Sequence, residues 1–315
     1  MARKIQHCLL QNAKFNKKDE FYTQFIDIEN ELQHYKTHFC NKIVFCNCDD
    51  PRNSNFFRFF VQNFDNLGLK KLICLSYNRS NGHGYYYEYS GNEKKYPEIG
   101  DLTKLIGNGD FRSNESKELL EKCDIVVTNP PFSLFREYVN QLVEFKKKFL
   151  IIGSVNSITY KNIFHLIKEN KVWLGINLGR GVSGFIVPPE YELYGTETKI
   201  DKYGNRIIAP NNCLWLTNLD NEIRNKNIIL TKQYKGNESQ YPFYDNYKAI
   251  NINKTKDIPM DYDGAMGVPI TFLHKFNPNQ FEIIKFRKGD NDKDLSINGR
   301  CPYFRIIIKK AATKT

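Results

Sequence analysis

The feature that most constrains this 315-residue chain is an alternation of apolar runs with amphipathic helical patterns between about residues 26 and 176. In one such helix, Ser54 is the predicted cap and Phe56, Phe57 and Phe60 belong to the apolar stripe. The runs expected to form strands are 43–46, 72–75, 125–127, 149–152 and 172–174. This pattern predicts an α/β fold with a doubly wound, mostly parallel sheet, which binds ligands at the carboxyl ends of its strands.

The pattern changes after residue 176, where Gly, Pro, Tyr and Asn become frequent and the apolar runs become short. This half predicts strands and loops rather than helices. We therefore divide the chain into a basic tail over residues 1–18, a domain over residues 19–220 and a strand- and loop-rich region over residues 221–315.

The chain is basic: 46 Lys and Arg against 35 Asp and Glu give a formal net charge of +11. Such an excess favours a polyanionic partner, most simply a nucleic acid. A lysine-rich surface that binds nothing in particular would give the same excess, so the charge alone leaves both explanations open.

The sequence predicts a cytoplasmic protein without a membrane partner. No run approaches the roughly 20 apolar residues that span a bilayer, and the N-terminus lacks an apolar secretory segment. The eight cysteines are scattered, as is typical of reduced thiols. His34 and His38 have a spacing that zinc ligands use, with Cys40, Cys46 and Cys48 nearby. No Cys-x-x-Cys pair accompanies them, and we expect no metal site.

The most informative segment is Asn129-Pro130-Pro131-Phe132, which follows a predicted strand and precedes a predicted helix. The prolines fix the backbone and remove two amide donors, so oxygen acceptors dominate the local polar surface. The Asn129 side chain and the Pro130 carbonyl can both accept from a planar amine, while Phe132 offers a stacking face. The segment resembles the signature of S-adenosylmethionine-dependent amino-methyltransferases; the alternative is a surface turn.

Other residues lie where such an enzyme binds its cofactor. A carboxylate after the first strand can receive the methionine ammonium, and Asp110 can accept from the cofactor adenine while Phe111 packs on its ring. Turns without a ligand are the alternative at both places. The residues expected to bind S-adenosylmethionine are Phe21, Tyr22, Thr23, Asn47, Asp49, Asp50, Asp110, Phe111 and Asn129.

Five segments together resemble the EcoRI-type adenine-specific DNA modification methylases, over roughly residues 15–308. They are 19–24 (Asp-Glu-Phe-Tyr-Thr-Gln), 46–51 (Cys-Asn-Cys-Asp-Asp-Pro), 109–111 (Gly-Asp-Phe), 128–135 (Thr-Asn-Pro-Pro-Phe-Ser-Leu-Phe) and 267–272 (Gly-Val-Pro-Ile-Thr-Phe). The resemblance implies a Rossmann-like catalytic domain over 19–220, a DNA recognition region over 221–315 and methylation of adenine N6 in duplex DNA. It also implies a partner restriction endonuclease.

The chain departs from the wider methyltransferase pattern in two places. No Gly-x-Gly turn follows the first strand, where Asp49-Asp50-Pro51 stands instead. The second strand ends without a carboxylate for the ribose hydroxyls, and Ser76 or Asn78 is the candidate substitute.

The implied mechanism is rotation of the target adenine out of the helix, followed by in-line methyl transfer that needs no strong general base. Phe185 is a candidate to stack on the extruded base. The candidate DNA contacts are Arg180, Lys199, Lys202, Arg206, Arg224, Lys226, Lys232 and Lys235. Two other functions remain open: an N-methyltransferase for RNA or a protein amide, and a catalytically silent DNA-binding subunit. The target sequence and the oligomeric state do not follow from the residues.

Overall fold

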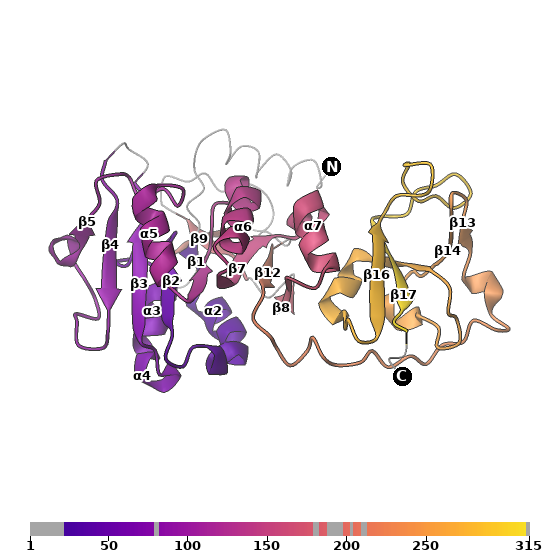
Figure 1. The fold of residues 1–315 in the computed structure, drawn as a ribbon, viewed down its shortest axis with the longest axis horizontal. Helices are drawn as coiled ribbons and strands as arrows, with labels where there is room; N and C mark the ends of the chain where they lie inside the picture. Colours follow the sequence, from indigo (N-terminus) through magenta and orange to yellow (C-terminus); the bar gives the residue numbers. More distant parts are fainter. Residues whose placement is uncertain are drawn as a thin grey trace. The chain divides into compact units, whose positions relative to one another are not determined.

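The computed structural model describes residues 22–78, 82–178, 183–187, 198–201, 204–208 and 213–312. The chain divides into two compact units. Unit 1 comprises Met1–Ile163 and Leu174–Leu219, and unit 2 comprises Phe164–Trp173 and Asp220–Thr315. Each unit is described separately (Figure 1).

Unit 1 is built on a mixed sheet, which in the described part of the chain has eight strands in the order β5-β4-β3-β2-β6-β7-β12-β8. Its centre is parallel, since β2 pairs in parallel with β3 and β6, and β6 with β7. The bounds are β2 Ile43–Cys46, β3 Lys71–Ser76, β4 Tyr85–Tyr89, β5 Thr103–Lys104, β6 Ile125–Thr128, β7 Lys148–Ser154, β8 Trp173–Leu178 and β12 Cys213–Thr217. The predicted strands therefore exist.

The edges of this sheet differ from the expectation of a mostly parallel arrangement. Strand β4 pairs antiparallel with β3, and β12 pairs antiparallel with β7. Strand β4 is formed by Tyr85–Tyr89, a segment that is not among the strands expected from the sequence. Parallel or antiparallel pairing at an edge depends on the path of the connecting loops, which local apolar patterns do not encode.

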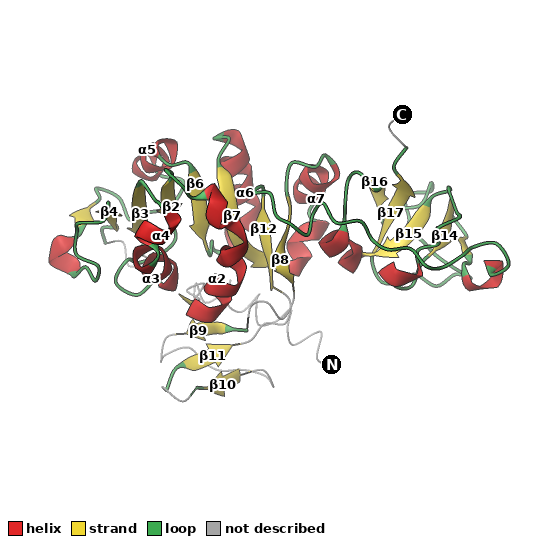
Figure 2. Cartoon of the chain, turned by 90° about the horizontal axis from the view of Figure 1, so that it is seen from below, coloured by secondary structure: helices red, strands yellow, loops and turns green. Residues whose placement is uncertain are grey.

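Helices cover both faces of the sheet (Figure 2). On one face, α3 (Asn55–Gln62) buries Phe56 and Phe60 in a cluster with strand residues such as Val44. On the other, α6 (Phe135–Glu144) lies so close to β7 that a Cβ on Gly153 would be 2.5 Å from the Phe135 ring. The remaining α-helices are α2 Phe25–Leu32, α4 Phe64–Leu67, α5 Asn114–Lys122 and α7 Lys161–Lys168.

A small antiparallel sheet adjoins this layer, in the order β1-β9-β11-β10. Its strands are β1 Tyr22–Thr23, β9 Phe185–Val187, β10 Thr198–Ile200 and β11 Arg206–Ile208. The buried Asp27 carboxylate of α2 accepts from the backbone N–H of Ser183 at 2.8 Å and from its hydroxyl at 3.0 Å. These bonds attach the start of β9 to the helix.

Unit 2 contains a five-stranded sheet in the order β13-β14-β15-β17-β16. Gly267 of β15 is required by packing, since a Cβ there would lie 2.1 Å from the Tyr244 hydroxyl oxygen. The strands are β13 Phe243–Tyr244, β14 Tyr247–Asn251, β15 Met266–Pro269, β16 Phe281–Phe286 and β17 Arg305–Lys310. Short 3-10 helices occur in both units, at Gln33–His38, Ile99–Asp101, Phe132–Leu134, Val155–Thr159, Glu238–Gln240, Thr255–Asp257 and Ile270–Lys275.

A fully buried carboxylate, Glu31 of α2, holds the edge strand β8. It accepts from the backbone N–H groups of Ile176 and Asn177, each at 2.8 Å, and from the Tyr35 hydroxyl at 2.9 Å. Burial raises the pKa of Glu31, and these hydrogen bonds oppose that rise.

We expect Glu31→Ala to lower the free energy of unfolding by about 3 kcal/mol, because it leaves buried donors without an acceptor. The measurement is urea unfolding followed by circular dichroism. Glu29→Ala, on an exposed position of the same helix, is the matched control and should change stability by less than about 0.5 kcal/mol. Equal stabilities of the two variants would contradict the role of Glu31.

Candidate active site

Asp49 connects the carboxyl ends of two neighbouring parallel strands. It follows β2, and its carboxylate accepts from the Ser54 hydroxyl at 2.8 Å and from the Thr128 hydroxyl at the end of β6. Ser54 in turn caps α3 by accepting from the backbone N–H of Phe56 at 3.1 Å. One side chain thus joins β2, β6 and the start of α3.

The Asn129–Phe132 segment begins directly after Thr128. Asn129 is partly exposed but its side-chain oxygen is buried, and Pro130 is buried. The partly exposed Phe132 ring packs edge-on against Phe185, with ring centroids 6.0 Å apart and an interplanar angle of 77°. Phe185 is only 1% exposed, so the structure makes it a support for Phe132 rather than an open stacking face.

The N-terminal residues reach the same place. Thr23 of β1 pairs with Phe185 of β9, and the Asn55 side chain at the start of α3 donates to the Thr23 carbonyl at 2.8 Å. The Thr23 hydroxyl is buried and has no hydrogen-bond partner within the described ranges. Tyr22 belongs to the same strand, whereas Phe21 lies outside the described residues.

Contacts therefore run from Asp49 through Thr128 to the Asn129–Phe132 segment, then through Phe185 to Thr23. Thr23 is bonded to Asn55, the neighbour of Ser54 in the sequence, and Ser54 is bonded to Asp49, so the contacts form a closed ring. Segments that are far apart in the sequence form a single site.

Asp50 and Asp110 share a local arrangement, in which the arginine two residues later binds the carboxylate through two nitrogens. For Asp50 and Arg52 the distances are 2.9 and 2.5 Å, and for Asp110 and Arg112 they are 2.9 and 2.7 Å. In each case the arginine backbone N–H also donates to the same carboxylate at 2.9 Å. We call these two arrangements the Asp-x-Arg clips.

Tyr138 of α6 is a site residue that sequence reasoning missed. Its buried hydroxyl donates to the side-chain oxygen of Asn47, and its ring packs edge-on against Phe111 with centroids 5.0 Å apart. Asn47 and Phe111, both expected to bind the cofactor, are buried, and Phe111 is only 5% exposed. The sequence did contain a signal for Tyr138, because its hydroxyl lies on the apolar face of a predicted helix. A hydroxyl that is buried there needs a hydrogen-bond acceptor nearby.

The two candidate carboxylates Asp49 and Asp110 differ electrostatically. Burial raises the pKa of Asp49 to about 6, although hydrogen bonds from Thr128 and Ser54 oppose the rise. Arg112 lowers the pKa of Asp110. A nearby positive charge would therefore stabilise the ionised form of Asp49 more than that of Asp110, which Arg112 already stabilises.

The ribose candidates at the end of β3 are not equivalent. The Ser76 hydroxyl donates to the Tyr85 carbonyl and accepts from the Tyr85 N–H, both at 3.1 Å. The Ser76 hydroxyl is therefore occupied by hydrogen bonds to the neighbouring strand. Asn78 is partly exposed just beyond the strand, and its side-chain nitrogen donates to the His83 carbonyl at 3.2 Å.

Of the candidate DNA contacts, Arg180 and Lys202 lie outside the described residues. Lys199 and Arg206 lie in the small sheet of unit 1. Arg224 of unit 2 stacks on the Trp173 ring, 3.4 Å from its centroid. The other three, Lys226, Lys232 and Lys235, are exposed in unit 2.

Among the described residues, no three His, Cys, Asp or Glu side chains are grouped so that they could hold a metal ion. No described helix is long and apolar enough to cross a membrane.

The raised pKa of Asp49 makes stability depend on pH. Because its pKa rises from the ordinary 3.8 to about 6 on folding, the folded protein binds more protons in that range. The free energy of unfolding therefore falls as the pH rises from about 4 to about 6. We expect Asp49→Asn to weaken this fall, measured by urea unfolding across the range. Asp65→Asn, at an exposed position of α4, is the control. An unchanged pH profile in Asp49→Asn would contradict the assignment.

The chain matches the family described as "Adenine-specific methyltransferase EcoRI" over residues 9–311. It is 66% identical to "Type II methyltransferase M.EcoRI" of Escherichia coli, over 98% of both chains. It is 41% identical to "Type II methyltransferase M.MgeORF184P" of Mycoplasma genitalium and 38% identical to "Type II methyltransferase M.MpnI" of Mycoplasma pneumoniae. Both matches cover 95% of this chain and 97% of the relative.

No solved structure gives a significant match. The resemblance stated from the sequence motifs is confirmed by the sequence comparisons: the chain belongs to the EcoRI family of adenine-specific methyltransferases.

Proposed function

We propose that this adenine-specific DNA methyltransferase transfers a methyl group from S-adenosylmethionine to N6 of an adenine rotated out of double-stranded DNA. The observation that carries the proposal is the bond between Asp49 and Thr128, because it places the candidate cofactor carboxylate one residue from Asn129. A base inside the duplex cannot reach a methyl donor held at a strand edge, so extrusion is required.

The residues present fit S-adenosylmethionine, which supplies an electrophilic methyl group on a positively charged sulfur. Asp49 is a partly buried carboxylate whose ionised form is disfavoured by desolvation, so a cation would stabilise it, and it would receive the methionine ammonium. Tyr22 and Thr23 would close over the methionine end, where the Thr23 hydroxyl is an available buried donor. Asp110 would accept from the adenine amine of the cofactor, with Asn78 near the ribose.

The two clips set the charge and geometry of this side of the site. Arg52 holds Asp50 and Arg112 holds Asp110, so the position of both carboxylates is fixed before a ligand arrives. Phe111 would contact the cofactor adenine with only the small part of its ring that is exposed, since the ring is packed against Tyr138. Asn47 would act through Tyr138 as a positioning residue.

On the substrate side, the Asn129 side-chain oxygen and the Pro130 carbonyl would accept from the two hydrogens of the adenine amine. These acceptors would stabilise the positive charge that develops on nitrogen as its bond to the methyl carbon forms and the methyl–sulfur bond breaks, with the electron pair left on sulfur. The nitrogen would then release one proton to water. Pro131 holds the backbone so that Phe132 faces the base, and Phe185 supports the Phe132 ring from behind.

The wider assignments follow the same proposal. Residues 19–220 form the catalytic domain, with a doubly wound Rossmann-like sheet, residues 221–315 form the DNA recognition region, and residues 1–18 form a basic tail. The enzyme acts in the cytoplasm and protects sites that a cognate restriction endonuclease cuts.

Transfer of a tritiated methyl group from S-adenosylmethionine to DNA, RNA and protein, assayed side by side, tests the function. We expect label in duplex DNA, as N6-methyladenine. Label confined to RNA or protein would overturn the proposal, and so would absence of transfer to all three.

We expect Asn129→Ala to lower the rate of methyl transfer by about 100-fold or more, because it removes a preorganised acceptor for the developing charge. Binding of S-adenosylhomocysteine, measured by calorimetry, and binding of duplex DNA should persist. Asn66→Ala, at an exposed position of α4, is the matched control. Turnover equal to the wild type in Asn129→Ala would remove this residue from the mechanism.

We expect Arg112→Lys to weaken S-adenosylhomocysteine binding about five- to tenfold, because an ammonium cannot replace the two-nitrogen contact with Asp110. Arg58→Lys, at an exposed position of α3, should bind like the wild type. Calorimetric titration measures both. An unchanged affinity in Arg112→Lys would show that the clip does not serve the cofactor.

A further inference from the structure

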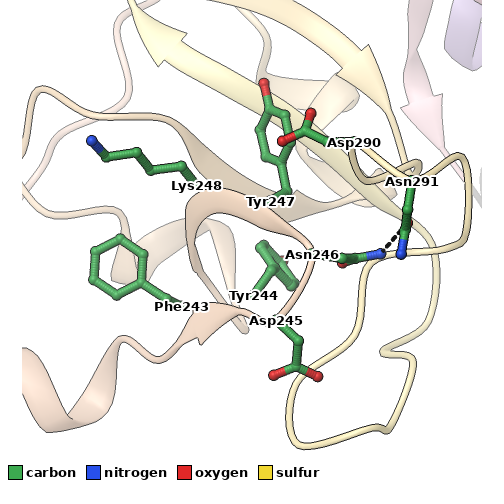
Figure 3. A pocket seen from close by; sticks show the side chains of 8 residues that line it. All are labelled: Phe243, Tyr244, Asp245, Asn246, Tyr247, Lys248, Asp290 and Asn291. Carbon is green, nitrogen blue, oxygen red and sulfur yellow. Dashed lines mark hydrogen bonds between the residues drawn. The ribbon is translucent and has the colours of Figure 1, made fainter.

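An open groove of about 500 Å³ lies in unit 2 at the turn between β13 and β14 (Figure 3). The lining residues are Phe243, Tyr244, Asp245, Asn246, Tyr247, Lys248, Asp290 and Asn291. Most of them are exposed, so the groove cannot enclose a small ligand in the way that typical cofactor sites do. Its shape suits the surface of a macromolecule.

The turn that forms the groove is fixed by hydrogen bonds to the loop after β16. The Asp245 carboxylate accepts from the Ser296 hydroxyl at 2.9 Å and from the Gly299 N–H at 2.9 Å. Asn246 donates to the side-chain oxygen of Asn291 at 2.9 Å and to the Asp294 carbonyl at 3.1 Å. The groove is therefore a preorganised polar surface.

Two side chains of the groove, Asn291 and Lys248, can donate to a ligand. The side-chain oxygen of Asn291 accepts from Asn246 and, at 3.1 Å, from the Lys293 N–H, which leaves its NH2 group to donate outward. Within the described residues Lys248 forms no ion pair, and it lines the groove together with Phe243, which is 48% exposed (Figure 3).

Each of the two carboxylates that line the groove has a partner within unit 2. Hydrogen bonds from the loop occupy both oxygens of Asp245 and lower its pKa. Asp290 lies 3.7 Å from the ammonium of Lys285, which itself sits over the Tyr247 ring. Residues 220–315 as a whole carry 17 Lys and Arg against 11 Asp and Glu. The region thus carries an excess of positive charge, which suits a polyanion, while the lining of the groove itself contains one Lys and two Asp.

We propose that this groove contacts duplex DNA, with the Asn291 amide donating to an acceptor on a base edge and Lys248 binding the adjacent phosphate. The inference rests on the proposed function and specifies part of its DNA interface. Asn is a residue that reads base edges, and purine N7 and O6 and thymine O4 are the acceptors available in the major groove. Lysine supplies a phosphate contact that is independent of sequence.

The test compares Asn291→Ala and Lys248→Ala with the wild type in equilibrium binding, with S-adenosylhomocysteine present. One duplex contains the site that the wild type methylates, and the other has that site scrambled. We expect Asn291→Ala to lower the ratio of the two affinities about tenfold and to keep the dependence on salt. Lys248→Ala should weaken binding to both duplexes and reduce the salt slope by about one.

Asn279→Ala and Lys70→Ala are matched controls on exposed positions, the latter at the amino end of β3, and both should bind like the wild type. An unchanged affinity ratio in Asn291→Ala, or an unchanged salt slope in Lys248→Ala, would overturn the proposal. Both results presuppose that the wild type methylates DNA. Failure of the groove assignment is therefore distinguishable from failure of the proposed function.

Discussion

The hydrogen bonds that Asp49 accepts from Ser54 and Thr128 are the interaction on which the rest of unit 1 depends. They fix the end of β2, the start of α3 and the end of β6 relative to one another. The carboxylate is desolvated to achieve this, and its raised pKa shows that two hydroxyl donors do not fully replace water. An anion that is incompletely compensated in the folded protein is typical of functional sites, where a ligand completes the compensation.

The charges of the other two candidate carboxylates, Asp50 and Asp110, are balanced within the chain. Asp50 and Asp110 each have an arginine two residues later, so their charge is balanced by a segment of three residues and needs nothing from the tertiary fold. This leaves Asp49 as the carboxylate whose partner must come from outside. The three aspartates therefore differ in whether an arginine follows two residues later in the sequence: Asp50 and Asp110 have one, and Asp49 does not.

Much of this site could be predicted because its signals are local. The strands at 43–46 and 125–128, the cap at Ser54 and the Asn129–Phe132 segment are each encoded in a few adjacent residues. The roles of Tyr138 and Phe185 could not, because they depend on contacts between residues 91 and 53 positions apart, Asn47 with Tyr138 and Phe132 with Phe185. The same holds for the antiparallel strands β4 and β12, whose direction depends on the path of the connecting chain.

The position of β12 has a consequence for biosynthesis. In the sheet β12 lies between β7 and β8, although it follows both in the chain. Strand β8 pairs with β12 and therefore has no strand of this sheet to join until the ribosome has released residues up to Thr217, the last residue of β12. All strands of the small sheet precede β12 in the chain, so the eight-stranded sheet is the one whose completion waits for β12. A nascent chain that stops before β12 holds the Asn129–Phe132 segment on an unfinished sheet.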